Sequence, residues 1–284
     1  MKILVTGAGG MLGRDVVLAA ANAGHDVVGL GRLELDVTSA EALAAKFEFE
    51  RPDVVINCAA WTDVDGAEDA EGAAMAVNGQ GAGNVAAAAA SVGASVVYVS
   101  SDYVFDGAKA DPYVETDQPA PLSAYGRTKL AGEEATAAAN KRHFVIRSSW
   151  LFGTGGSNFV ETMLRLAATQ NEVLVVRDQV GSPTYTWHLA YGLVRLIEGV
   201  EFGIHHMAAG GTCSWYDFAR EIFEQAKVEC LVLSATTEML GRPALRPPYS
   251  ALTSQREHAI ELPPWRDGLA AYLSQRTAEQ ETPA

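Results

Sequence analysis

The stretch Thr6-Gly7-Ala8-Gly9-Gly10-Met11-Leu12-Gly13 decides the fold class of this 284-residue chain. It follows an apolar run with strand character, Lys2–Thr6, and it opens a helical segment, Leu12–Ala23. Glycines at a strand-to-helix turn let the backbone approach a pyrophosphate, and the helix N-terminus offers free N–H groups. A tight turn is the alternative, but the flanking strand and helix are the context that a dinucleotide site requires. We assign cofactor contacts to Gly7, Gly10, Met11, Leu12 and Gly13.

The first half of the chain alternates between short apolar runs and alanine-rich helical segments. The expected strands are Lys2–Thr6, Asp26–Leu30, Val54–Asn57, Ser95–Ser100 and His143–Arg147, and the expected helices are Leu12–Ala23, Ala40–Phe49, Ala67–Ser91 and Tyr125–Ala139. This pattern predicts an α/β fold with a Rossmann-type, doubly wound parallel sheet. Residues 1–150 would form the dinucleotide-binding domain, with some later segments returning to it. Residues 151–284 would mainly form a smaller, mixed substrate-binding lobe, and we expect the polar end, Ser274–Ala284, to fray.

The charge balance excludes several classes of partner. With 21 Lys and Arg against 35 Asp and Glu, the formal net charge is −14. That excess of carboxylates disfavours nucleic-acid binding and docking on anionic lipid. The three cysteines, Cys58, Cys213 and Cys230, have no metal-ligand spacing, and no apolar signal segment precedes the first strand. We therefore expect a cytoplasmic protein.

The second strand favours NADPH over NADH as cofactor. An NAD site usually carries a carboxylate at the tip of this strand, whereas here the strand is followed by Gly31-Arg32. A guanidinium matches the geometry of a 2′-phosphate, although a solvated loop arginine close to Glu34 is the alternative. Asp36 and Val37 would contact the adenine. The small residues after the third strand would let the cofactor ribose lie against the backbone, and they add Ala59, Ala60 and Thr62 to the cofactor set.

A serine at a strand end and a tyrosine–lysine pair carry the predicted chemistry. Ser101 follows the fourth strand, and Tyr125 and Lys129 lie one helical turn apart in Tyr125-Gly126-Arg127-Thr128-Lys129. An ammonium about 4 Å from a phenol would stabilise the phenolate by up to about 4 kcal/mol, or about three pKa units. Tyr125 would then serve as a general acid near neutral pH, with Ser101 as a second hydrogen-bond donor to the substrate oxygen.

These motifs together resemble the extended short-chain dehydrogenase/reductases, and within them the dTDP-4-dehydrorhamnose reductases. The similarity covers nearly the whole chain, and the segments that carry it most specifically are Arg147–Phe152, Asp178–Thr184 and Arg246–Leu252. The resemblance implies NADPH-dependent reduction of the C4 keto group of dTDP-4-dehydro-6-deoxy-L-mannose. It implies Ser101, Tyr125 and Lys129 as catalytic residues. It places Ser101, Asp102, Tyr103, Trp150, Gln179 and Arg246 around the dTDP-sugar. For Arg147 we consider two roles, contact with the diphosphate of the substrate or an ion pair inside the second lobe.

The chain departs from the family pattern at a few positions. Ser101 stands where the family usually has threonine, and Tyr249 replaces an asparagine. Some members hold magnesium at a dimer contact, but no matching carboxylate set is found here, so metal and homodimer stay open. Two alternatives remain for function: a related dTDP-4-keto-6-deoxysugar reductase with another product, and a non-catalytic, nucleotide-binding regulatory subunit.

Overall fold

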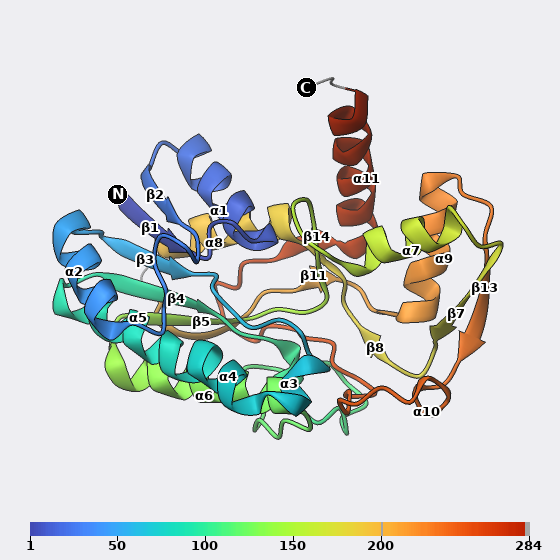
Figure 1. The fold of residues 1–284 in the computed structure, drawn as a ribbon, viewed down its shortest axis with the longest axis horizontal. Coiled ribbons are helices and arrows are strands. Elements are labelled where there is room, and N and C mark those ends of the chain that lie inside the picture. Colours follow the sequence, from blue (N-terminus) through green and yellow to red (C-terminus); the bar gives the residue numbers. More distant parts are fainter. Residues whose placement is uncertain (200, 282–284) are drawn as a thin grey trace.

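The central sheet brings the apolar runs of the first half of the chain together. The computed structural model describes residues 1–199 and 201–281 (Figure 1). Its main sheet contains β1 (Lys2–Thr6), β2 (Asp26–Leu30), β3 (Val54–Asn57), β4 (Ser95–Val99), β5 (His143–Arg147) and β10 (Gly203–His206). The strand order is β10-β5-β4-β3-β1-β2, and every neighbouring pair is parallel. The predicted doubly wound parallel sheet is confirmed.

The strand order itself predicts where a ligand binds. From β1 the chain continues to β2 on one side and then returns to β3 on the other side. Such a reversal opens a crevice at the carboxyl ends of the strands on either side of it. Because Thr6 is in register with Asn57, the glycine turn after β1 and the small residues after β3 meet at this crevice.

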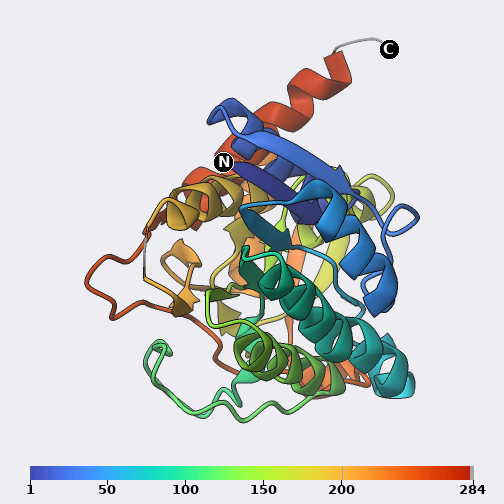
Figure 2. The same ribbon diagram turned by 90° about the vertical axis from the view of Figure 1, so that its left-hand side faces the viewer.

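Helices cover both faces of the sheet, so its strands are buried and can be apolar throughout. One face packs against α1 (Met11–Asn22) and α8 (Thr186–Ile197). The other face packs against α2 (Ala40–Glu50), α5 (Ala82–Ser91) and α6 (Ala124–Ala139), with α5 and α6 side by side in Figure 2. Both α8 and β10 come after residue 150, yet β10 is a strand of this sheet and α8 covers one of its faces. A boundary between two lobes at residue 150 stays a prediction.

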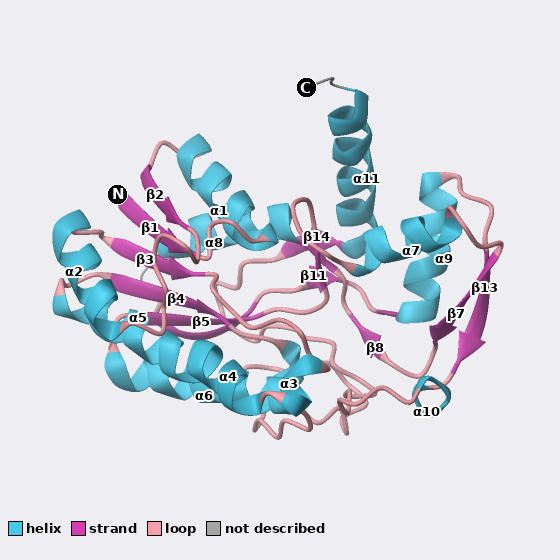
Figure 3. Ribbon diagram, in the orientation of Figure 1, coloured by secondary structure: helices cyan, strands magenta, loops and turns pink. Residues whose placement is uncertain are grey.

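A second core lies at the right of Figure 1, among helices and short strand pairs that Figure 3 distinguishes by colour. Its helices are α7 (Phe159–Ala167), α9 (Trp215–Ala226), α10 (Thr237–Leu240) and α11 (Trp265–Glu281). Its strands form short pairs: β6 (Leu151–Phe152) with β9 (Thr184–Tyr185), β7 (Glu172–Val176) with β13 (Leu231–Ala235), β8 (Val180–Gly181) with β12 (Cys213–Ser214), and β11 (Ala209–Gly210) with β14 (Leu262–Pro264). No helix in the described part of the chain has the length and apolar character needed to cross a membrane.

One expectation about a helix is wrong. The expected helix Ala67–Ser91 is divided into α3 (Gly66–Asp69), α4 (Glu71–Met75), a π-helical turn (Ala76–Gly81) and α5. Asn78 lies in that turn, is buried, and forms hydrogen bonds with the backbone of Trp61. The helix α11 continues to Glu281, and the fraying of Ser274–Ala284 stays a prediction. Residues 282–284 lie outside the described part.

Candidate active site

The glycine turn forms a cradle for an anion between β1 and α1. Gly7 has a φ of +67°, and a Cβ there would lie 2.6 Å from the amide nitrogen of Ala59. A Cβ on Gly13 would overlap the carbonyl oxygen of Gly7. Gly10 caps α1 without a side chain, so the first amides of this helix face outward unblocked. Free amides and the positive end of the helix dipole favour a phosphate at this point.

A hollow of about 530 Å³ extends from the glycine turn over the tips of β2 and β3. Its wall contains seven of the predicted cofactor residues, Gly7, Gly10, Arg32, Asp36, Val37, Ala59 and Ala60. Glu34 accepts a hydrogen bond from the amide of Gly31 at 2.6 Å and forms no ion pair with Arg32 within the described residues. Asp36 accepts hydrogen bonds from the amide and hydroxyl of Thr38, and these bonds lower its pKa. The Arg32 guanidinium is thus left for a ligand.

A second hollow, of about 600 Å³, continues from the first across Gly10, Cys58 and Ala60, which line both. The remaining predicted cofactor residues lie in its wall, namely Met11, Leu12, Gly13 and Thr62. Its wall also contains Ser101, Asp102, Tyr103, Tyr125, Lys129 and Trp150. The structure therefore brings the two halves of the predicted site to one continuous surface.

Ser101 and Tyr125 face each other from different elements. Ser101 lies two residues after the end of β4 and caps a 3-10 turn, Asp102–Val104, by accepting a hydrogen bond from the amide of Tyr103 at 3.1 Å. Tyr125 lies in the first turn of α6, which Ser123 caps by accepting a hydrogen bond from the amide of Gly126. Burial raises the pKa of Tyr125 to about 12, and the hydroxyl of Ser101 opposes that rise. Tyr125 is therefore protonated at neutral pH and can donate a proton.

Lys129 does not adopt the expected relationship with Tyr125. Its ammonium donates a 2.6 Å hydrogen bond to the carbonyl oxygen of Val99 and lies 4.4 Å from the ring centroid of Tyr98. The expectation that Lys129 lowers the pKa of Tyr125 toward neutrality is wrong for this arrangement, because burial dominates both groups. Burial also lowers the pKa of Lys129, to about 7.

Asp102 is a buried carboxyl group in the wall of the second hollow, only 1% exposed. The hydroxyl of Ser101 donates a hydrogen bond to it at 3.0 Å. Burial raises its pKa to about 7, despite the opposing hydrogen bonds from Ser250 and Ser101. At neutral pH a substantial fraction of this carboxyl group is therefore protonated.

The residues predicted for the sugar nucleotide line the second hollow and a third one of about 370 Å³. Tyr103 contributes to both, Trp150 to the second, and Gln179 and Arg246 to the third. The floor of the third hollow is mostly apolar and is formed by Phe159, Met163, Leu166, Leu174, Val175, Val176 and Leu240. An apolar floor beside arginines suits a ligand with a flat base and an anionic group.

The hydrogen bonds around Arg147 exclude contact between its guanidinium and a diphosphate. Arg147 is 2% exposed and donates to both carboxylate oxygens of Glu133, at 2.7 Å from Nη2 and 2.9 Å from Nε. Ser100 donates to the same carboxylate at 2.5 Å. A guanidinium enclosed in this way is not available to a diphosphate. Arg147 does form an ion pair, but its partner Glu133 lies on α6, so the expected ion pair inside the second lobe is wrong as to place.

Asn78 is a buried residue that supports the candidate site and was not predicted. Its side-chain oxygen accepts a hydrogen bond from the amide of Trp61 at 2.8 Å, and its nitrogen donates to Thr128 at 3.0 Å. It thereby fixes the loop after β3 to the helix that carries Tyr125 and Lys129. A buried asparagine beside two glycines, Gly79 and Gly81, was the available signal.

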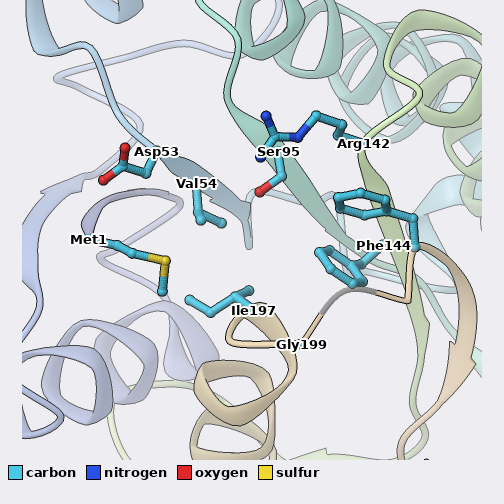
Figure 4. Close-up of a pocket in the computed structure, with 9 residues that line it drawn as sticks. Met1, Asp53, Val54, Ser95, Arg142, Phe144, Ile197 and Gly199 are labelled. Carbon is cyan, nitrogen blue, oxygen red and sulfur yellow. The ribbon is translucent and has the colours of Figure 1, made fainter.

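Two further observations limit where ligands bind. Another hollow, of about 500 Å³, lies at the opposite, amino-terminal edge of the sheet, between Met1, Asp53, Ser95, Arg142 and Phe144 (Figure 4). None of the predicted site residues lines it. Within residues 1–199 and 201–281, no cluster of three or more His, Cys, Asp or Glu side chains could hold a metal ion.

Comparison with known proteins gives matches over almost the whole chain. Residues 1–278 match the family model described as RmlD substrate binding domain. A dTDP-4-dehydrorhamnose reductase from Mycolicibacterium smegmatis is 46% identical over 270 residues, which cover 94% of this chain and 82% of that relative. Spore coat polysaccharide biosynthesis protein SpsK from Bacillus subtilis is 42% identical over 98% of both chains. The crystal structure of dTDP-4-dehydrorhamnose reductase from Bacillus anthracis in complex with NADP has a TM-score of 0.94 and 37% identity, covering 96% of this chain and 99% of that one.

Proposed function

The chain belongs to the RmlD substrate binding domain family, and from this premise we propose that it is an NADPH-dependent reductase of a dTDP-sugar. The substrate is dTDP-4-dehydrorhamnose, whose C4 keto group is reduced to give dTDP-L-rhamnose. One observation carries the proposal: Ser101, Tyr125 and Lys129 lie where the hollow for a dinucleotide meets the hollow for a nucleotide sugar. The named reductases among the relatives support this substrate.

The residues present fit a dinucleotide cofactor. Side chains at Gly7 and Gly13 would clash with the backbone of the turn and of the loop after β3, so this close-packed turn requires glycine, and α1 begins there without a side-chain cap. Arg32, which forms no ion pair within the described residues, would hold a 2′-phosphate, which is why we propose NADPH over NADH. When bound, the cofactor supplies a hydride to the carbonyl carbon.

The side chains of this chain would then handle the oxygen of the ketone. Tyr125, protonated at neutral pH, donates its proton to the developing alkoxide, and Ser101 donates a hydrogen bond to the same oxygen. Lys129 would leave the carbonyl of Val99 to hold the ribose of the nicotinamide nucleoside. Asp102, Tyr103 and Trp150 would surround the sugar, and Gln179 and Arg246 would contact the nucleotide. The three free cysteines suit a reducing compartment, and we propose the cytoplasm.

The test follows the oxidation of NADPH in the presence of dTDP-4-dehydro-β-L-rhamnose generated in situ. Rapid oxidation, with dTDP-L-rhamnose identified by NMR, is the expected result. A different sugar product would move the assignment to a related reductase, as the match to SpsK would then suggest. No oxidation with NADPH or NADH, although NADPH binds, would contradict the proposal and favour the regulatory alternative.

The cofactor preference has its own test. In Arg32→Ala, the KM for NADPH should rise by about tenfold or more, because one charge-assisted contact to the 2′-phosphate is lost. The KM for NADH should stay unchanged. Arg51→Ala is the matched control, since Arg51 is paired with Glu48 at the end of α2. An equal rise for both cofactors would contradict the assignment of Arg32.

A further inference from the structure

An ion cluster joins the cofactor side of the molecule to the substrate side. Asp65 lies at the start of α3, directly after the loop whose Thr62 and Val64 line the catalytic hollow. Arg242 and Arg246 line the third hollow from the other lobe. The carboxylate of Asp65 binds both guanidiniums, although it is 181 positions from Arg246 in the sequence.

The carboxylate of Asp65 is saturated by these contacts. Its Oδ1 accepts hydrogen bonds from Nη1 of Arg246 at 3.0 Å and from the amide of Ala244 at 3.2 Å. Its Oδ2 accepts from Nη2 of Arg246 at 3.0 Å and from Nη1 of Arg242 at 3.1 Å. A carboxylate has about four acceptor sites. An asparagine could not reproduce this set, because it would turn an NH₂ group toward a guanidinium.

The contact to Arg246 uses only one edge of the guanidinium. Asp65 and the carbonyl oxygen of Ala244 bind Nη1 and Nη2 from the end of the side chain. A guanidinium has a second edge for two-point binding, formed by Nε and Nη2. The hydroxyl of Tyr103 contacts Arg246, and Tyr103 lies in both the second and the third hollow. Both hydrogens of Nη1 and one of Nη2 are used by Asp65 and Ala244, so the contact with Tyr103 falls on the second edge. This edge therefore lies where the sugar hollow meets the nucleotide hollow, beside the hydroxyl of Tyr103.

The cluster of Asp65, Arg242 and Arg246 is partly shielded from water and carries a net positive charge. Arg246 and Asp65 are 15% and 21% exposed, so their pair is shielded from water, whereas Arg242 is 61% exposed. Burial acts to raise the pKa of Asp65, but the hydrogen bonds from Arg246 and Ala244 outweigh it and the net shift is downward. Two guanidiniums on one carboxylate leave a net positive charge at the edge of a strongly acidic protein.

We propose that Asp65 is a positioning residue, which holds Arg246 so that its second edge, together with the hydroxyl of Tyr103, binds the diphosphate of the sugar nucleotide. The inference rests on the proposed function, because it takes the diphosphate from that substrate. Arg242 adds charge at the mouth of the same hollow. Asp65 does not compete with the diphosphate for Arg246, because the two bind different edges of the guanidinium.

Asp65→Asn tests the proposal, with the dissociation constants of dTDP and thymidine measured by calorimetry. The affinity for dTDP should fall by about tenfold, the effect of losing one well-placed charged contact. The affinity for thymidine and for NADPH should stay at the wild-type value. In turnover, KM for the sugar nucleotide should rise while kcat stays unchanged. Asp63→Asn is the matched control, because Asp63 lies in the same loop and its carboxylate accepts a hydrogen bond from the amide of Gly66 and forms no ion pair within the described residues.

Each other outcome overturns the inference in a distinguishable way. Tighter dTDP binding by Asp65→Asn would show that Asp65 competes for the arginines. Equal losses for dTDP and thymidine, or the same loss in Asp63→Asn, would show a structural or a long-range charge effect. If the wild-type protein binds no dTDP, the proposed function falls together with the inference. If it binds dTDP and Asp65→Asn binds it equally well, the inference alone falls.

Discussion

The indole rings of Trp150 and Trp215 stack face to face, with 3.6 Å between the ring centroids and 4° between the ring planes. Trp150 follows β5 and has a φ of +49°, an uncommon conformation for a side chain of this size. Trp215 is the first residue of α9, in the other lobe. Both rings line the catalytic hollow, so the stack forms the wall at which the two lobes meet.

Gly181→Ala should disturb this stack and weaken binding of the sugar nucleotide. A Cβ on Gly181 would lie 2.5–2.8 Å from three atoms of the Trp150 ring, so the ring must move. Overpacking of this kind costs about 1–3 kcal/mol. We expect a higher KM for the sugar nucleotide in steady-state assays and an unchanged dissociation constant for NADPH. The control is Gly72→Ala, where the added Cβ meets nothing within 4 Å. A KM equal to that of the wild type would show that the stack does not contact the substrate.

Tyr125→Phe should retain NADPH binding and lose turnover. The substitution removes only a hydroxyl from a ring that packs edge-on against Tyr103, with the centroids 5.6 Å apart. Loss of a general acid lowers kcat by roughly 10²–10⁴. The measurement is kcat at saturating substrate, with NADPH titrated by fluorescence as the check on folding. Turnover at the wild-type rate would remove Tyr125 from the mechanism.

Local patterns were enough to predict the sheet, and the residues that they select for the candidate site line adjoining hollows. The glycine turn, the strand ends and the tyrosine–lysine spacing are each patterns of a few residues. Together they select residues that line the first and the second hollow. The direction of the Lys129 side chain was not predictable in this way, because the carbonyl of Val99 comes from another element. Asp65 and Arg246 are likewise joined only by the folded chain. Asn78 was missed because helical periodicity does not reveal a π-helical turn.

The Glu133–Arg147 pair should behave as one unit in the stability of the protein. Both side chains are almost completely buried, at 5% and 2% exposure. Removing one partner of a buried pair costs about 3–5 kcal/mol, because an unpaired charge stays inside. We therefore expect a loss of this size in Glu133→Gln or Arg147→Met, measured by urea unfolding. The double variant Glu133→Met with Arg147→Met should be far more stable than the summed losses suggest.

The surface pair Arg127–Glu71 provides the contrast for that experiment. Its side chains are 43% and 41% exposed, and its N–O distance is 2.8 Å. Because water screens exposed pairs, Glu71→Gln should cost less than about 1 kcal/mol. If the double variant of Glu133 and Arg147 loses as much free energy of unfolding as the two single variants together, the two residues stabilise the fold independently.

Asp102→Asn should stabilise the protein above neutral pH and have little effect in acid. Burial raises the pKa of Asp102 from its ordinary value of 3.8 to about 7. Below pH 3.8 the carboxyl group is neutral in the folded and unfolded states, so its burial carries no charge penalty. As the pH rises through 7, the folded state must hold a buried carboxylate that the unfolded state keeps in water. A shift of about three units corresponds to roughly 4 kcal/mol, as an upper figure.

The difference in the free energy of unfolding between Asp102→Asn and the wild type should therefore grow from pH 4 to pH 7 and level off above that range. Asp106→Asn gives a control of opposite sign. Hydrogen bonds from Ala108 and Tyr113 lower the pKa of Asp106, so its charged form stabilises the fold. That variant should be less stable than the wild type at neutral pH, and the loss should vanish in acid. A difference for Asp102→Asn that is the same at pH 5 and pH 8 in urea unfolding would mean that the effect comes from packing, and that Asp102 does not titrate near neutrality in the folded protein.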